Sequence, residues 1–98
     1  MNKLDRGQAV GLLEVDGVCA AFAAIDVAAK TGNVVIESVE RTREGCNVCI
    51  KIRGDVSSVR EAIEVAEKTA RNVSKVKTYT IIPAPMCDTE KILSYSDI

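Results

Sequence analysis

The stretch VCIKIRGDVSSVREAIEVAEKTAR, residues 48–71, contains a strand and a helix joined by a short polar turn. The alternating apolar positions, typical of a half-buried strand, are Val48, Ile50 and Ile52. The apolar positions at helical spacing, which form one stripe, are Val56, Val59, Ile63, Ala66 and Ala70. Asp55 or Ser58 can cap this helix, which we expect to run to about Arg71.

The same order of elements occurs in the first half of the chain. A strand is predicted over residues 8–15, an Ala-rich helix over 18–29 and a second strand over 34–39. Gly32 is well placed to end that helix in a left-handed conformation. A final strand is predicted over residues 76–82. Strand, helix and strand twice over predict an α+β fold, the ferredoxin-like split βαβ (βαββαβ) two-layer sandwich, with one bare sheet face.

The length of 98 residues fits one domain with one modest core. We expect an N-terminal arm over residues 1–7, a single domain over 8–93 and a C-terminal tail over 94–98. A short C-terminal helix is expected to start at Asp88 or Thr89.

Composition excludes several classes of function. The net charge is −1 and aromatic residues make up only 3%, whereas a nucleic-acid-binding protein is expected to be basic with stacking aromatics. No apolar run could span a bilayer, and the first residues lack the apolar stretch of a signal peptide, so we expect a cytoplasmic protein. The chain has no histidine and no phosphate-binding glycine loop, which argues against an enzyme.

The first helix is apolar nearly all round, because Asp26 is its one charged residue between Val18 and Ala29. A helix on the surface of a monomer normally keeps a polar face. We therefore expect it to pack on the sheet with one side and on a neighbouring subunit with another. Cys19 is interpreted as a small buried apolar residue on this helix.

Six short motifs, in order and at matching spacing, make the chain resemble the single-domain hexameric shell proteins of bacterial microcompartments. The motifs are AVGLLE (9–14), KTGNV (30–34), RGDV (53–56), ARNV (70–73) and IPAP (82–85), followed by EKIL (90–93). The resemblance implies a homohexameric tile with a pore on its axis. It also implies that tiles join each other and other shell proteins into a sheet that encloses enzymes.

The resemblance also implies roles at the tile edge. Lys30 and Asn33 would lie there, with Lys30 donating hydrogen bonds to backbone carbonyls of the next tile. An ordinary solvated lysine at a helix C-terminus is the alternative. The chain departs from the family at Ala84, where many members carry an arginine, and this removes one anchor from the edge.

By the same resemblance, the loop between the second and third strands forms the pore. Its lining residues would be Arg43, Glu44, Gly45, Cys46 and Asn47. Six-fold symmetry would bring six Cys46 thiols to one axis. Either Cys46 is a small residue that leaves an open hole, or its thiolates bind metal, as an iron–sulfur cluster or zinc. Six thiols around a site that needs four ligands cannot all bind at once.

Cys46 and Cys49 form a C-x-x-C pair, but a strand follows them rather than the helix that a thioredoxin-type motif requires. Residues three apart in a strand point to opposite faces, so the two cysteines cannot easily share one metal. Cys49 is expected either under a helix or on the open face of the sheet.

Two alternatives to a shell subunit remain. One is a small-molecule-binding regulatory domain of the same ferredoxin-like fold. The other is an iron–sulfur electron carrier, which would need about four suitably spaced cysteines per cluster in one chain.

Overall fold

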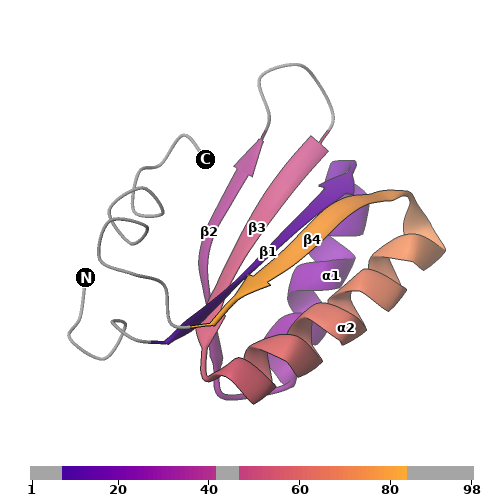
Figure 1. The fold of residues 1–98 in the computed structure, drawn as a ribbon. Helices are drawn as coiled ribbons and strands as arrows, with labels where there is room; N and C mark the ends of the chain where they lie inside the picture. Colours follow the sequence, from indigo (N-terminus) through magenta and orange to yellow (C-terminus); the bar gives the residue numbers. More distant parts are fainter. Residues whose placement is uncertain (1–7, 42–46, 84–98) are drawn as a thin grey trace.

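The described part of the chain folds into two layers, an antiparallel four-stranded sheet and two helices that cover one of its faces (Figure 1). The computed structural model describes residues 8–41 and 47–83. The elements are β1 (Ala9–Asp16), α1 (Val18–Lys30), β2 (Val34–Arg41), β3 (Asn47–Gly54), α2 (Val56–Val73) and β4 (Val76–Ile82).

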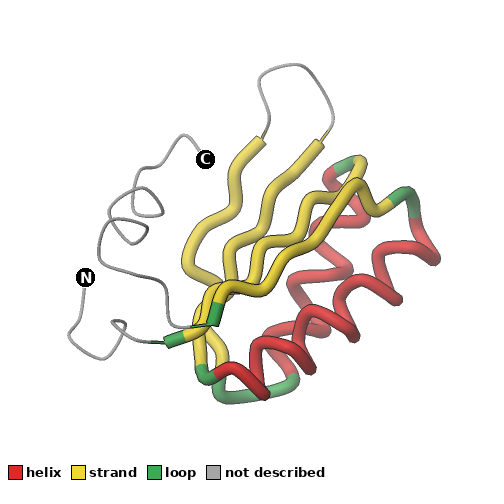
Figure 2. Tube along the Cα trace, viewed as in Figure 1, coloured by secondary structure: helices red, strands yellow, loops and turns green. Residues whose placement is uncertain are grey.

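The strands lie in the order β2-β3-β1-β4, so that β3 and β1 are central and β2 and β4 form the two edges. Each strand–helix–strand unit therefore has a strand of the other unit between its own two strands. This is the split βαβ arrangement expected from the sequence. Figure 2 shows both helices on the same side of the sheet, so that none of the described residues forms a helix on the other face, which we call the open face.

Successive side chains along each strand lie on opposite faces of the sheet. Ile50 and Ile52 of β3 belong to the core under the helices, together with Leu13 of β1. The intervening β3 residues, Cys49 and Arg53 among them, lie on the open face. Of the two positions left open for Cys49, the open face is the correct one.

Helix α1 packs closely on the sheet through small side chains. Its buried residues are Ala20, Ala21, Ala24 and Ala28. The helix follows Gly17 (φ 97°), and its C-terminal turn contains Gly32 (φ 77°), so the predicted left-handed end is confirmed. The prediction for Cys19 was wrong, because this side chain is exposed. It lies one position before the buried alanine stripe and thus on the outer side of the helix.

Helix α2 is capped by Asp55, whose side chain accepts a hydrogen bond from the Ser58 backbone N–H at 2.9 Å. Val59, Ile63 and the alanines of the predicted stripe are buried, together with Ala62. Val56 is an exception, since 41% of its surface is exposed. It is the first residue of the helix, so its side chain lies beyond the area that the sheet covers.

Three strands differ slightly from their predicted bounds. β3, predicted from Val48, begins at Asn47, because Asn47 pairs with Asp16. Hydrogen bonding explains the other two. β1 ends at Asp16 because the Asp16 N–H donates to the Lys75 carbonyl at 2.9 Å. β2 continues to Arg41 because its last residues remain paired with β3. The short C-terminal helix, Ala84 and the proposed arm and tail lie outside the described residues. No helix in the described part is long and apolar enough to cross a membrane.

Candidate functional site

The hairpin that the sequence predicts as the pore joins β2 to β3. Arg43, Glu44, Gly45 and Cys46 lie outside the described residues, whereas Asn47 is the first residue of β3. Asn47 is half-buried and pairs with Asp16 of β1. The start of β3 therefore lies beside the end of β1, close to the start of α1.

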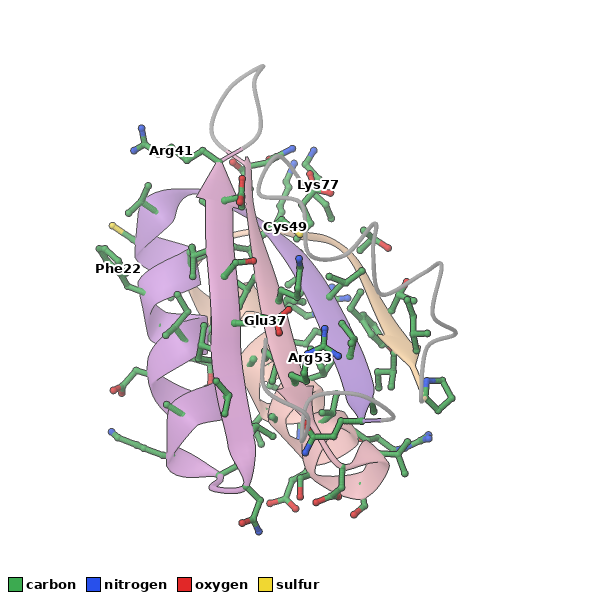
Figure 3. The ribbon with its side chains drawn as sticks, turned by 90° about the vertical axis from the view of Figure 1, so that its left-hand side faces the viewer. Phe22, Glu37, Arg41, Cys49, Arg53 and Lys77 are labelled. Carbon is green, nitrogen blue, oxygen red and sulfur yellow. The ribbon has the colours of Figure 1, made fainter. Side chains whose placement is uncertain are left out.

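An ion pair on the open face links β2 to β3. The Nε of Arg53 donates to Oε2 of Glu37 at 2.7 Å, and its Nη2 donates to Oε1 at 3.2 Å. The Arg53 side chain is 2% exposed and that of Glu37 is 27% exposed. Figure 3 views the sheet from its open side and shows the two side chains pointing toward each other. Two parallel contacts of this kind fix geometry as well as charge.

Glu37 is also the point at which the pairing of β2 with β3 changes. Ile36 pairs with Ile52, but Ser38 pairs with Lys51, so β2 has one extra residue between these two pairs. This is a β-bulge, a feature that redirects side chains along a strand.

Nearer the hairpin, a thiol lies between two carboxylates on the open face. Cys49 pairs with Glu40 of β2 on one side and with Glu14 of β1 on the other. Burial raises the pKa of the Cys49 thiol, and the charges of Glu14 and Glu40 raise it further, while Lys51 lowers it. Cys49 is therefore a neutral thiol at neutral pH.

The described part of the chain offers no metal centre of its own. Within residues 8–41 and 47–83, no group of three or more His, Cys, Asp or Glu side chains could hold a metal ion.

The two predicted tile-edge residues lie at the same corner. Lys30 is the last residue of α1, and its Nζ lies 3.0 Å from Oδ2 of Asp26, with both side chains largely exposed. Asn33 is exposed and has a positive φ of 58°, which asparagine tolerates better than most residues. The corner thus presents a lysine and an asparagine outward from a defined backbone.

Large apolar side chains are exposed at both edges of the sheet. On the β2 side are Phe22 of α1, which is 68% exposed, and Val35, which is 65% exposed. On the β4 side, Tyr79 is 48% exposed. These side chains remain exposed to water in the single folded chain.

Sequence reasoning did not identify the Glu37–Arg53 pair or the bulge. One signal was present, since residues 34–36 are three apolar residues in succession and so break strict alternation before Glu37. The exposure of Phe22 was also missed as a specific feature, although an interface on this helix was expected.

Comparison with known proteins gives consistent results. The model of the BMC domain family matches residues 9–85. The bacterial microcompartment shell protein PduA of Citrobacter freundii is 40% identical over 86 residues, which is 88% of this chain and 91% of PduA. The carboxysome shell protein CcmK4 of Synechococcus elongatus is 34% identical over 87 residues, covering 87% of this chain and 76% of CcmK4.

Solved structures agree on the fold. A microcompartments protein from Desulfitobacterium hafniense DCB superposes with a TM-score of 0.76 at 26% sequence identity. The match covers 86% of this chain but 47% of the other, so this chain spans about half the length of that protein. On the strength of the family match and of these relatives, the chain belongs to the BMC domain family, with the shell proteins of bacterial microcompartments.

Proposed function

We propose that the chain is a structural subunit of a bacterial microcompartment shell and that six copies form a ring-shaped tile with a pore on its axis. Family membership accounts for the shell role and for a location in microcompartments of the cytoplasm. The observation that carries the ring is the pair of exposed apolar edges, Phe22 with Val35 on one side and Tyr79 on the other.

Those edges differ from each other, which suits a cyclic assembly. β2 and β4 are the outer strands, and each has only one neighbour within the described sheet. A contact between the β2 side of one copy and the β4 side of the next is heterologous, and a heterologous contact closes into a ring when the rotation fits. The interface would cover the exposed apolar side chains that a monomer leaves in water.

In such a ring, the β2–β3 hairpin supplies the pore. Arg43, Glu44, Gly45, Cys46 and Asn47 would line it, and small polar metabolites would pass. Six copies of any one of these residues meet on the axis, so a single side chain determines the chemistry of the opening.

Two roles stay open for Cys46 in this pore. As a small side chain it would leave the hole free, and as a thiolate it would hold an iron–sulfur cluster or zinc and close the hole. Anaerobic reconstitution with iron and sulfide, followed by visible absorption, separates them. The metal role predicts colour in the wild type and none in Cys46→Ser, whereas the open-pore role predicts two colourless proteins.

At the outer edge, Lys30 and Asn33 would join neighbouring tiles, which include other shell proteins of the same compartment. Enzymes enclosed by the shell would be further partners. The chain's own role is structural and not catalytic, in keeping with relatives that are named as shell proteins.

Native mass spectrometry tests the proposal. We expect a species of six subunits at micromolar concentration. A protein that remains monomeric there, and whose thermal unfolding temperature rises with a small-molecule effector, would instead be the regulatory domain of the same fold.

A further inference from the structure

Because of the bulge at Glu37, each side chain in the second half of β2 lies on the opposite face of the sheet from the one that regular alternation would give it. Ile36 pairs with Ile52 and lies on the helix side. Beyond the extra residue, Glu40 pairs with Cys49 and therefore lies on the open face, because partners in an antiparallel ladder point to the same side.

An uninterrupted ladder would give a different surface. If the pairing of Ile36 with Ile52 continued without the extra residue, Val39 would stand opposite Cys49, and Glu40 would move to the helix side opposite Val48. The bulge thus decides whether a carboxylate or a methyl group lies beside the thiol.

The hydrophobic pattern of β2 only weakly favours the bulged register over the uninterrupted one. Val39 is about half exposed although it lies on the helix side, so little apolar burial opposes a slip of one residue. The ion pair constrains the register more strongly. Arg53 donates two hydrogen bonds, at 2.7 and 3.2 Å, to the carboxylate of the extra residue, Glu37. Because the guanidinium is buried, this contact has one preferred geometry.

We propose that Glu37 is a positioning residue for the Cys49 thiol: its ion pair with Arg53 holds the bulge, and the bulge places Glu40 beside Cys49, opposite Glu14. The proposal goes beyond the shell function and requires no ring. Its chemical result is a thiol that is kept neutral and unreactive, next to the segment that carries Cys46.

The charges around the thiol come from three strands. Glu14 on β1 and Glu40 on β2 oppose ionisation of Cys49, while Lys51 on β3 favours it. The remaining partner in the row, Thr78 of β4, is uncharged. Lys77 of β4 lies toward the same end of the sheet (Figure 3).

The test measures how fast iodoacetamide alkylates Cys49 as a function of pH. Cys49 is made the sole thiol by changing Cys19, Cys46 and Cys87 to serine. In this protein Glu37→Thr, which suits a strand but lacks the carboxylate, should let β2 slip and replace Glu40 by Val39. The inflection of the rate profile should move to lower pH, with up to about a tenfold faster reaction at pH 8. An unchanged profile in the folded variant overturns the proposal.

Two further variants separate register from charge. Deletion of Glu37 removes its carboxylate but leaves Ser38 opposite Lys51, so Glu40 stays beside Cys49 and the profile should match that of the parent. In a Glu40→Gln background, Glu37→Thr should have no additional effect. A shifted profile in the deletion variant, or two additive shifts, would mean that Glu37 acts through its own charge and would refute the positioning role.

If Glu37→Thr does not fold, Glu37→Asp provides the measurement, because it keeps the charge and shortens the reach to Arg53. The expected result is a smaller shift in the same direction, and an Asp variant with the parent profile counts against the proposal. The oligomeric state of each variant is measured separately. A protein that does not form hexamers contradicts the proposed ring, whereas an unchanged alkylation profile contradicts the positioning role of Glu37.

Discussion

Gly11 of β1 lies directly under Ile63 of α2, so close that a Cβ atom at residue 11 would stand 2.8 Å from Cγ1 of Ile63. The same atom would stand 2.8 Å from Cγ1 of Val59. Both neighbours are β-branched and stiff at χ1, so neither can turn away easily. The absence of a side chain at residue 11 thus sets how closely α2 approaches the sheet.

Gly11→Ala should therefore destabilise the fold. Overpacking of a close-packed core costs about 1–3 kcal/mol, which exceeds the gain of about 0.5–1 kcal/mol from replacing a glycine within a strand. Urea unfolding measures the difference. The cost should shrink in an Ile63→Ala background and shrink further when Val59→Ala is added. An equal cost in all three backgrounds would show that these two contacts are not responsible.

The Asp55 cap gives a pH dependence with a definite sign. Hydrogen bonds from the backbone N–H of Ser58 and from the hydroxyls of Ser57 and Ser58 lower the pKa of the Asp55 carboxyl. The folded-state pKa thus lies below the unfolded one. The contribution is present above the ordinary aspartate pKa of about 3.9 and is lost as the pH falls through the folded value.

Comparison with Asp55→Asn measures this effect, because asparagine also caps helices but does not titrate. The stability difference between the wild type and this variant should decrease between pH 6 and pH 2 in urea unfolding. A difference that is constant over this range would contradict the assignment. Asp55→Ala, which removes the cap, should lower the melting temperature at neutral pH as well.

Phe22→Lys should affect assembly and leave folding nearly unchanged. The side chain is 68% exposed in the single chain, so its replacement should change stability by no more than about 0.5 kcal/mol. In the proposed ring it is buried against the next copy, where an unpaired lysine charge is costly. Size-exclusion chromatography should show monomers. Glu61→Gln on the exposed face of α2, which changes the net charge by the same amount, serves as the control and should still form hexamers.

Lys30→Ala should separate ring formation from tile-to-tile contact. The Lys30–Asp26 pair is exposed, so its loss should cost less than about 0.5 kcal/mol of stability. Hexamers should persist, while extended sheets in electron micrographs should disappear. Asp26→Asn frees the lysine and keeps its charge, and sheets should still form. Sheets formed by Lys30→Ala would remove Lys30 from the edge contact.

The sequence predicted the fold well where a residue pattern is compatible with only one local structure. The β4 bounds were confirmed without change, and Gly32 ends α1 as expected, because a left-handed residue is required there. Cys19 was predicted to be buried but is exposed. Because the helix is apolar nearly all round, it has no polar face that would indicate which side lies away from the sheet.

The candidate site was less predictable. The Glu37–Arg53 contact depends on which residue of β2 is the extra one, and that depends on pairing between strands that the local pattern does not specify. The tile-edge roles of Lys30 and Asn33 and the pore role of residues 43–47 stay predictions, because they concern contacts between copies.

The turn that carries Lys30 and Asn33 has two successive residues with positive φ, Gly32 at 77° and Asn33 at 58°. Glycine and asparagine adopt such φ values more readily than other residues, so the path of this bend depends on the identity of two adjacent residues. In the proposed tile contact, a neighbouring tile would meet the outline that this bend gives to the corner. A change at residue 32 or 33 that redirects the bend would then alter which shell proteins can share an edge with this one.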